Sequence, residues 1–193
     1  MVSDIFNQTN FLDILIVIVL FRICYIAARM GLTIEIFKFL GVIFATYISL
    51  HYYTSLSDIV ARSLYAKGVH FEFFDLVIFL VLGAGGYIGF AAIRGAFYRF
   101  VKLEIIPVIN KFGGFLLGII RGFFVIGLLV FTLSISNISY LTRSVKHSYL
   151  GSRAFLISPN TYGWLWGNIF SKFSSKEKFN PAVNEAIGRF NGK

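Results

Sequence analysis

The sequence predicts an all-α integral membrane protein with four transmembrane helices and a C-terminal amphipathic surface helix. Of its 193 residues, 57% are hydrophobic and only 14% are charged, whereas a soluble domain carries roughly 45–50% apolar and about 25% charged residues. The apolar residues gather in four stretches, and the basic residues lie at the ends of these stretches and in the C-terminal part. Both observations are typical of helices that cross a bilayer.

Each apolar stretch reaches the ~20 residues that a helix needs to cross the hydrocarbon layer. Asn10 is a suitable N-cap for the first helix, and Gly31 marks its end. Together the stretches predict a four-helix membrane domain over residues 1–137. The predicted spans are 11–30, 34–53, 73–93 and 112–136.

A polar C-terminal region follows, and it predicts a membrane-surface helical segment over residues 138–173. Ser158 and Pro159 provide an N-cap and a proline at the first helical position. The helix behind them has an apolar face, and its aromatic residues would lie at headgroup depth as membrane-interface residues: Tyr162, Trp164, Trp166 and Phe170. The alternative is a helix packed on the protein's own core. Residues 174–193 are mostly polar and basic, which predicts a mobile basic tail.

The charge and the motifs exclude several classes of protein. The net charge of +9 comes from residues at span ends and in the tail, a distribution that indicates contact with membrane lipids and no nucleic-acid binding. The single cysteine, Cys24, forms neither an internal disulfide nor a cysteine-based zinc site. No nucleophile elbow, phosphate-binding loop or zinc-binding histidine motif occurs. We therefore expect no enzymatic activity, no catalytic residues, no cofactor and no metal.

Glycines at intervals of four residues predict close helix packing. The fourth span carries Gly114, Gly118 and Gly122, and the third carries Gly85 and Gly89. Glycines at this spacing line one helix face and let another backbone approach closely. The pattern predicts tight packing of the third and fourth spans, or of two copies of the chain.

Five charged residues lie in or near the spans, namely Asp13, Arg22, Glu35, Asp75 and Arg121. Arg121 lies deep in the fourth span, where an arginine costs about 2.5–3.5 kcal/mol on insertion scales. It therefore needs a partner, and Asp13, Glu35 and Asp75 are the candidates. One interpretation is a buried polar site for a solute or a partner, with Arg22, Arg121, Asp13 and Asp75 in one pocket. The other is a structural arginine bonded to backbone carbonyls and one acid.

Four segments follow one another along residues 11–135: FLDILIVIVL, Gly31 with Glu35, HYYTSLS and NKFGGFLLGIIRG. In this order they resemble the colicin V production protein family of bacterial inner-membrane proteins. The first helix, FLDILIVIVL, carries an early acid at Asp13. Gly31 is followed four residues later by Glu35, as in the family, although Met30 stands where the family has arginine. The segment HYYTSLS, at 51–57, is similar to the end of the second helix in family members.

The fourth span carries the most specific part of this resemblance, NKFGGFLLGIIRG at 110–122. The family has an acid and an arginine at the start of this pattern, where this chain has Asn110 and Lys111. The remaining pattern residues match in place: Gly114, Gly118, Arg121 and Gly122.

The resemblance implies a multi-pass protein of the bacterial inner membrane that supports toxin production or export and envelope function. In related proteins an extracytoplasmic protease domain follows the four spans, which implies that both termini lie outside; the loop charges alone nearly balance. The expected function is that of a non-enzymatic accessory protein that contacts other envelope proteins or itself through helix faces. The alternative is a small oligomeric transporter or channel with an arginine site in the membrane.

Overall fold

Every regular element in the described part of the chain is helical. The computed structural model describes residues 10–65, 74–100, 107–136, 138–173 and 177–192. Four helices within these ranges are long and apolar enough to cross a membrane, so the predicted fold class is confirmed. They are α2 (Phe11–Met30), α3 (Leu32–Tyr65), α4 (Phe74–Phe100) and α5 (Pro107–Ser134).

The start of α2 is secured by reciprocal capping between Asn10 and Asp13. The Asn10 side chain accepts a hydrogen bond from the Leu12 N–H at 2.6 Å, and the Asp13 carboxylate accepts one from the Asn10 N–H at 3.0 Å. Such a capping box stabilises a helix by about 0.5–2 kcal/mol. The helix ends at Gly31, whose φ of +83° lies in the region that favours glycine.

Three helices extend beyond the apolar stretches that predict them. α3 continues twelve residues past the predicted 34–53 span, to Tyr65, and α4 continues from the predicted 73–93 to Phe100. α5 starts at Pro107, earlier than the predicted 112, and ends at Ser134. Hydropathy marks only the part of a helix that lies in lipid, whereas backbone hydrogen bonding continues into water. At 34 residues, α3 is roughly 50 Å long and exceeds the ~30 Å hydrocarbon thickness.

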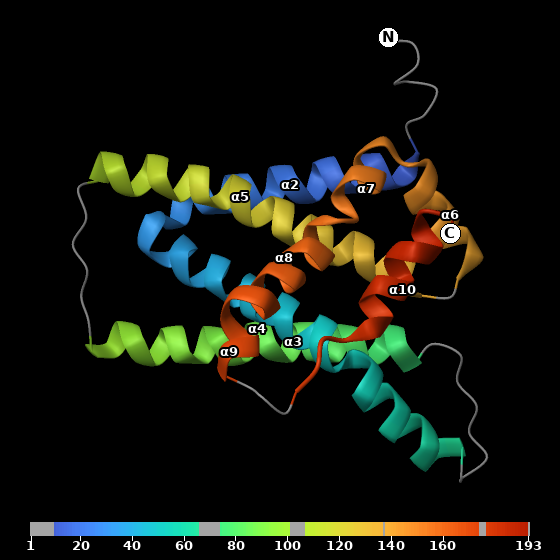
Figure 1. Ribbon diagram of the computed structural model, residues 1–193. Helices are drawn as coiled ribbons and strands as arrows, with labels where there is room; N and C mark the ends of the chain where they lie inside the picture. The colour runs from blue at the N-terminus through green and yellow to red at the C-terminus, as the bar shows by residue number, and fades with distance from the viewer. Residues whose placement is uncertain (1–9, 66–73, 101–106, 137, 174–176, 193) are drawn as a thin grey trace.

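The four long helices pack mainly as two pairs. α2 lies beside α5, and α3 lies beside α4, while α3 also packs on α5 and so joins the pairs. Figure 1 shows α3 running obliquely between the α2–α5 pair and α4. α4 and α5, the third and fourth spans, make little contact, so the prediction that these two spans pack tightly is wrong.

Short helices at the C-terminal end fold back onto this bundle. α6 and α7 pack on one end of α5, and α7 also contacts α2. α8 lies across α3 and α5, as Figure 1 shows. The elements are α6 (Ser139–His147), α7 (Tyr149–Ala154), α8 (Ile157–Leu165), the π-helical turn η1 (Trp166–Phe170), α9 (Ser171–Phe173) and α10 (Pro181–Phe190).

The predicted membrane-surface helix packs on the protein's own core, so the surface prediction is wrong for most of its aromatic residues. Tyr162 is fully buried, and Trp166 and Phe170 pack against the hydrophobic core. Of the four predicted interface residues, Trp164 alone is accessible from outside the bundle, with 60% of its surface exposed. The amphipathic pattern is real, but its apolar face binds α3 and α5 and not lipid.

A glycine on α5 explains how closely α8 approaches the bundle. A Cβ atom on Gly127 would lie 2.7 Å from the Ile157 Cβ at the start of α8. Any larger residue would therefore push α8 away. Glycine at this position is outside the pattern of four-residue intervals, which is why the close approach was not predicted.

The predicted mobile tail contains an ordered helix. α10 starts after Asn180, whose side chain accepts the Ala182 N–H, and Val183 is fully buried. Phe190 stacks on Phe155 with ring centroids 4.0 Å apart. Residues 174–176 of the predicted tail lie outside the described residues. Residues 181–190 form a helix with one apolar face, which the mostly polar composition of the tail did not indicate. The tail prediction is therefore wrong for these residues.

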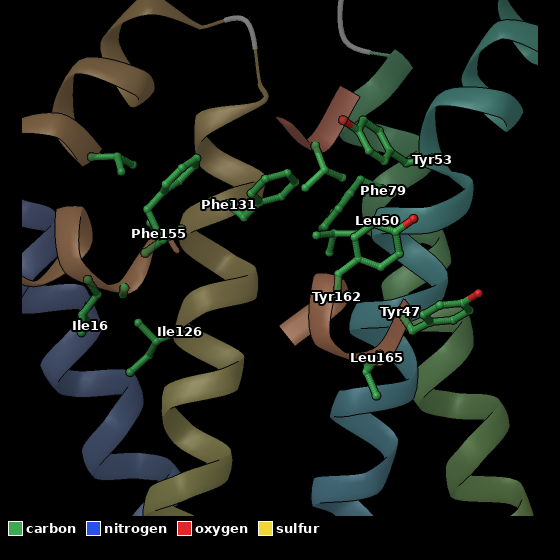
Figure 2. Close-up of a cluster of buried hydrophobic side chains, with 14 of the residues drawn as sticks. Ile16, Tyr47, Leu50, Tyr53, Phe79, Ile126, Phe131, Phe155, Tyr162 and Leu165 are labelled. Atoms are coloured by element: carbon green, nitrogen blue, oxygen red, sulfur yellow. The ribbon is translucent and has the colours of Figure 1, made fainter. Parts of the chain in front are cut away.

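The hydrophobic core unites both helix pairs with the C-terminal helices. Figure 2 shows Ile16 and Ile126 on the α2–α5 pair, and Leu50 and Phe79 on the α3–α4 pair. Tyr162 of α8 points in among the side chains of α3. The C-terminal helices are therefore an integral part of the fold.

Candidate functional site

A buried cluster of three charged side chains joins α5 to α3. The Arg121 Nε donates to Glu35 Oε2 at 2.8 Å, and the Lys38 Nζ donates to Glu35 Oε1 at 2.8 Å. Glu35 is fully buried and Arg121 is only 7% exposed. Arg121 lies halfway along α5, whereas Glu35 and Lys38 lie in the first turns of α3. Of the three candidate acids, Glu35 is therefore the one that the fold places against Arg121.

This geometry holds α3 against α5 and differs from that of an open binding site. We call the side chains of Glu35, Lys38 and Arg121 the helix clamp. Both oxygens of the Glu35 carboxylate are bound, one by each cation. In a medium of low dielectric constant, leaving any one of these charges without its partner is costly. The cluster therefore holds α3 in one position along α5.

The glycines of α5 form a seam against α2 that brings Arg121 and Glu35 together. A Cβ atom on Gly114 would meet the backbone of Gly31 at 2.7 Å, and one on Gly122 would meet Leu20 at 2.6 Å. A Cβ atom on Gly118 would overlap the Ala27 side chain and lie 3.9 Å from Glu35 Oε2. These three glycines thus pack on α2, whereas packing on the third span or on a second copy of the chain was predicted.

Asn110 supports the turn that connects α2 to α3. Its Oδ1 accepts a hydrogen bond from the Leu32 N–H at 2.7 Å. This bond satisfies a backbone donor at the start of α3 and holds Gly31 against α5. Sequence reasoning did not assign Asn110 or Lys38 to the site, although Asn110 occupies a position of the family pattern.

The predicted pocket of Asp13, Arg22, Asp75 and Arg121 does not form. The Asp13 carboxylate accepts hydrogen bonds from the Ser148 hydroxyl at 2.6 Å and from a backbone N–H of α7, so it joins α7 to α2. Arg22 is exposed on α2. Asp75 lines a cavity at the end of the bundle. Only Arg121 contributes to the Glu35 cluster.

A second polar cluster, centred on His51, was not predicted. The Asn180 N–H donates to the Tyr162 oxygen at 2.9 Å, and the Tyr162 hydroxyl lies 2.8 Å from His51 Nδ1. Burial raises the pKa of Tyr162 to about 12, so the hydroxyl keeps its proton at neutral pH and donates it to Nδ1. The proton of His51 is then on Nε2, which lies 3.4 Å from Glu177 Oε2.

This cluster holds the C-terminal helices on α3. Aromatic rings cover His51, because Tyr47 and Trp166 each stack on it with centroids 5.2 Å away. The sequence showed no zinc-binding histidine motif, and no role was predicted for His51. The partners of His51 lie more than 100 residues away, and no local spacing could have indicated them.

Replacing Tyr162 by phenylalanine tests the His51 cluster. The change leaves two buried polar groups without their partner, the Asn180 N–H and His51 Nδ1, so we expect a loss of about 1–3 kcal/mol in the free energy of unfolding. The measurement is SDS-induced unfolding of the protein in mild detergent, followed by circular dichroism. Tyr140→Phe is the control, since Tyr140 is 65% exposed. Equal stability of the two variants would contradict the assignment.

The glycines of α4 lie on a face that the bundle leaves open. A Cβ atom on Gly85 or Gly89 would meet no atom of the described residues within 4 Å. Neighbouring large apolar residues on α4 are also exposed, among them Val81 at 60% and Ile88 at 66%. By contrast, Gly86 faces Ala45 of α3.

The fold and the buried cluster define a class, a helical multi-pass membrane protein. Its four long apolar helices are held together by a glycine seam and a buried ion pair. The comparison with protein families gives the particular family. The colicin V production protein family matches residues 12–156, which cover the four long helices except Phe11, and the chain belongs to this family. No curated protein and no solved structure matches the chain.

Proposed function

We propose that this protein is a non-enzymatic accessory protein of the bacterial inner membrane that supports toxin production or export and envelope function through contacts with partner helices. The open glycine face of α4 carries the proposal. Of the five glycines predicted to pack, the three on α5 are used within the described chain, whereas Gly85 and Gly89 remain open to a second backbone. Small residues at this spacing allow close contact between helices in lipid. The partner is another envelope protein or a second copy of the chain.

The site geometry favours this function over transport at Arg121. A transporter in which Arg121 accepts an anion needs that guanidinium to meet the solute. In this structure its Nε is bound to Glu35, and the side chain is almost fully buried. The same proposal places both termini outside the cell, on the side where the described ends of the chain lie together in Figure 1.

Replacing Gly85 by leucine tests the proposed partner surface. The tagged full chain is purified from native membranes in mild detergent, and the masses of the eluted complexes are determined. We expect Gly85→Leu to reduce the partner-bound fraction several-fold, because leucine prevents close approach of a second backbone.

Gly95→Leu is the matched control for this experiment. Gly95 is also open on α4, but at 100° per residue it lies roughly 100° around the helix from the Gly85–Gly89 face. It should keep the complex intact. A complex that survives Gly85→Leu, or that is lost equally in both variants, would rule out this face as the partner surface.

A further inference from the structure

A cavity of about 680 Å³, lined by both polar and apolar residues, lies at the end of the bundle where α5 ends and α4 begins. Its walls come from α3, α4, α5, α6 and α10, and they include Ser134, the last residue of α5, and Asp75, the second residue of α4. The apolar helices end here, so the cavity lies at the depth of the membrane–water interface, where phospholipid headgroups are found. Neither the helix clamp nor the α4 face uses it.

The cavity lining includes opposite charges that form no ion pair within the described residues. Arg143 and Asp75 both line it, and neither forms an ion pair with any residue in the described ranges. Arg189 is paired with Glu185 at 3.6 Å, and Lys146 donates to the Arg189 carbonyl at 2.9 Å. As far as the described residues go, the cavity therefore offers one guanidinium and one carboxylate without an ion-pair partner, those of Arg143 and Asp75.

The hydroxyl of Tyr53 is a third group in the cavity lining that could meet a ligand. Tyr53 lines the cavity and is only 3% exposed, with its ring packed edge-on against Phe79. Its hydroxyl forms no hydrogen bond to a residue that the structure describes. A hydroxyl that lines a cavity and keeps its proton free can donate to a bound ligand.

We propose that this cavity binds the headgroup of a phospholipid that carries both a phosphate and an ammonium group. The Arg143 guanidinium would bind the phosphate, as arginine commonly does, and the Tyr53 hydroxyl would donate to a phosphate oxygen. The Asp75 carboxylate would accept the ammonium group. This inference is independent of the proposed partner surface on α4, which involves none of these residues.

Native mass spectrometry of the full chain in mild detergent tests the proposal. Phosphatidylethanolamine and phosphatidylglycerol with identical acyl chains are added separately, and the lipid-bound fraction is measured. We expect the wild type to retain one phosphatidylethanolamine in preference to phosphatidylglycerol. Arg143→Gln should weaken binding of both lipids about tenfold, since it removes a charge-assisted pair. Asp75→Asn should abolish the preference and leave phosphatidylglycerol binding intact.

Two further variants make the result decisive. Tyr53→Phe removes a hydroxyl that bonds to no described protein group, so it should lower lipid binding several-fold without affecting folding. Lys172→Gln removes an exposed cation outside the cavity and should leave binding unchanged. Equal lipid retention in Arg143→Gln, Tyr53→Phe and Lys172→Gln would overturn the proposal. Complete displacement of the lipid by an equal concentration of soluble glycerophosphoethanolamine would overturn the lipid assignment in favour of a free solute.

Discussion

Replacing Glu35 by alanine is expected to destabilise the protein by about 3–5 kcal/mol, because it leaves the Arg121 guanidinium buried without its counter-charge. Arg121 donates to the Glu35 carboxylate at 2.8 Å and is 7% exposed. The neighbouring Lys38, whose side chain is 12% exposed, would lose its partner as well. The measurement is the free energy of unfolding in detergent, from SDS titration followed by circular dichroism.

An exposed acid on the same helix provides the control for Glu35→Ala. Asp58 is exposed on α3, and Asp58→Ala should change stability by no more than about 0.5 kcal/mol. The double variant Glu35→Leu with Arg121→Leu removes both charges of the pair and should recover most of the lost stability. If Glu35→Ala were as stable as Asp58→Ala, the clamp role of the ion pair would be wrong.

The double variant also separates the two candidate functions. If the ion pair acts as a clamp, Glu35→Leu with Arg121→Leu should keep the partner complex that the open face of α4 supports. If Arg121 accepts a transported anion, the same variant should fold normally and yet lose function. Complex formation and toxin production measured on one variant therefore distinguish an accessory protein from a transporter.

The membrane helices could be predicted from sequence because their signal is local and strong. A run of ~20 apolar residues has few alternatives to a membrane-crossing helix, since each backbone group must be bonded within the segment. The ends of α3 and α4 could not be predicted in the same way. The run of apolar residues ends at the lipid boundary, whereas the helices continue into the aqueous layer.

The site could be predicted only in part because its geometry depends on long-range pairing. The depth of Arg121 indicates that it needs an acid, but three acids satisfied that condition equally in the sequence. The α5 glycines indicate a close neighbour without identifying it, and the neighbour is α2. The aromatic residues of 157–173 have the same spacing whether they face lipid or protein. The structure shows that Tyr162, Trp166 and Phe170 face protein, whereas Trp164 is exposed.

The second large loss of stability is expected for Gly114→Ala, a change in the glycine seam between α5 and α2. The added Cβ atom would lie 2.7 Å from the Gly31 carbonyl carbon and 2.9 Å from the Leu32 nitrogen. Both are backbone atoms at a turn, so no side-chain rotation can relieve the overlap. α5 would have to move away from α2, and the Arg121–Glu35 pair and the Asn110–Leu32 hydrogen bond would be strained with it. We expect a loss of about 1–3 kcal/mol or more in the free energy of unfolding.

Gly89→Ala is the matched control for Gly114→Ala, because it makes the same chemical change on a helix face that nothing described occupies. Alanine favours helix by up to about 1 kcal/mol relative to glycine, so this variant should be neutral or slightly stabilised. Both variants are compared by SDS unfolding under identical conditions. A similar stability for the two would mean that α2 and α5 can separate without cost, and the seam would then not position the buried ion pair.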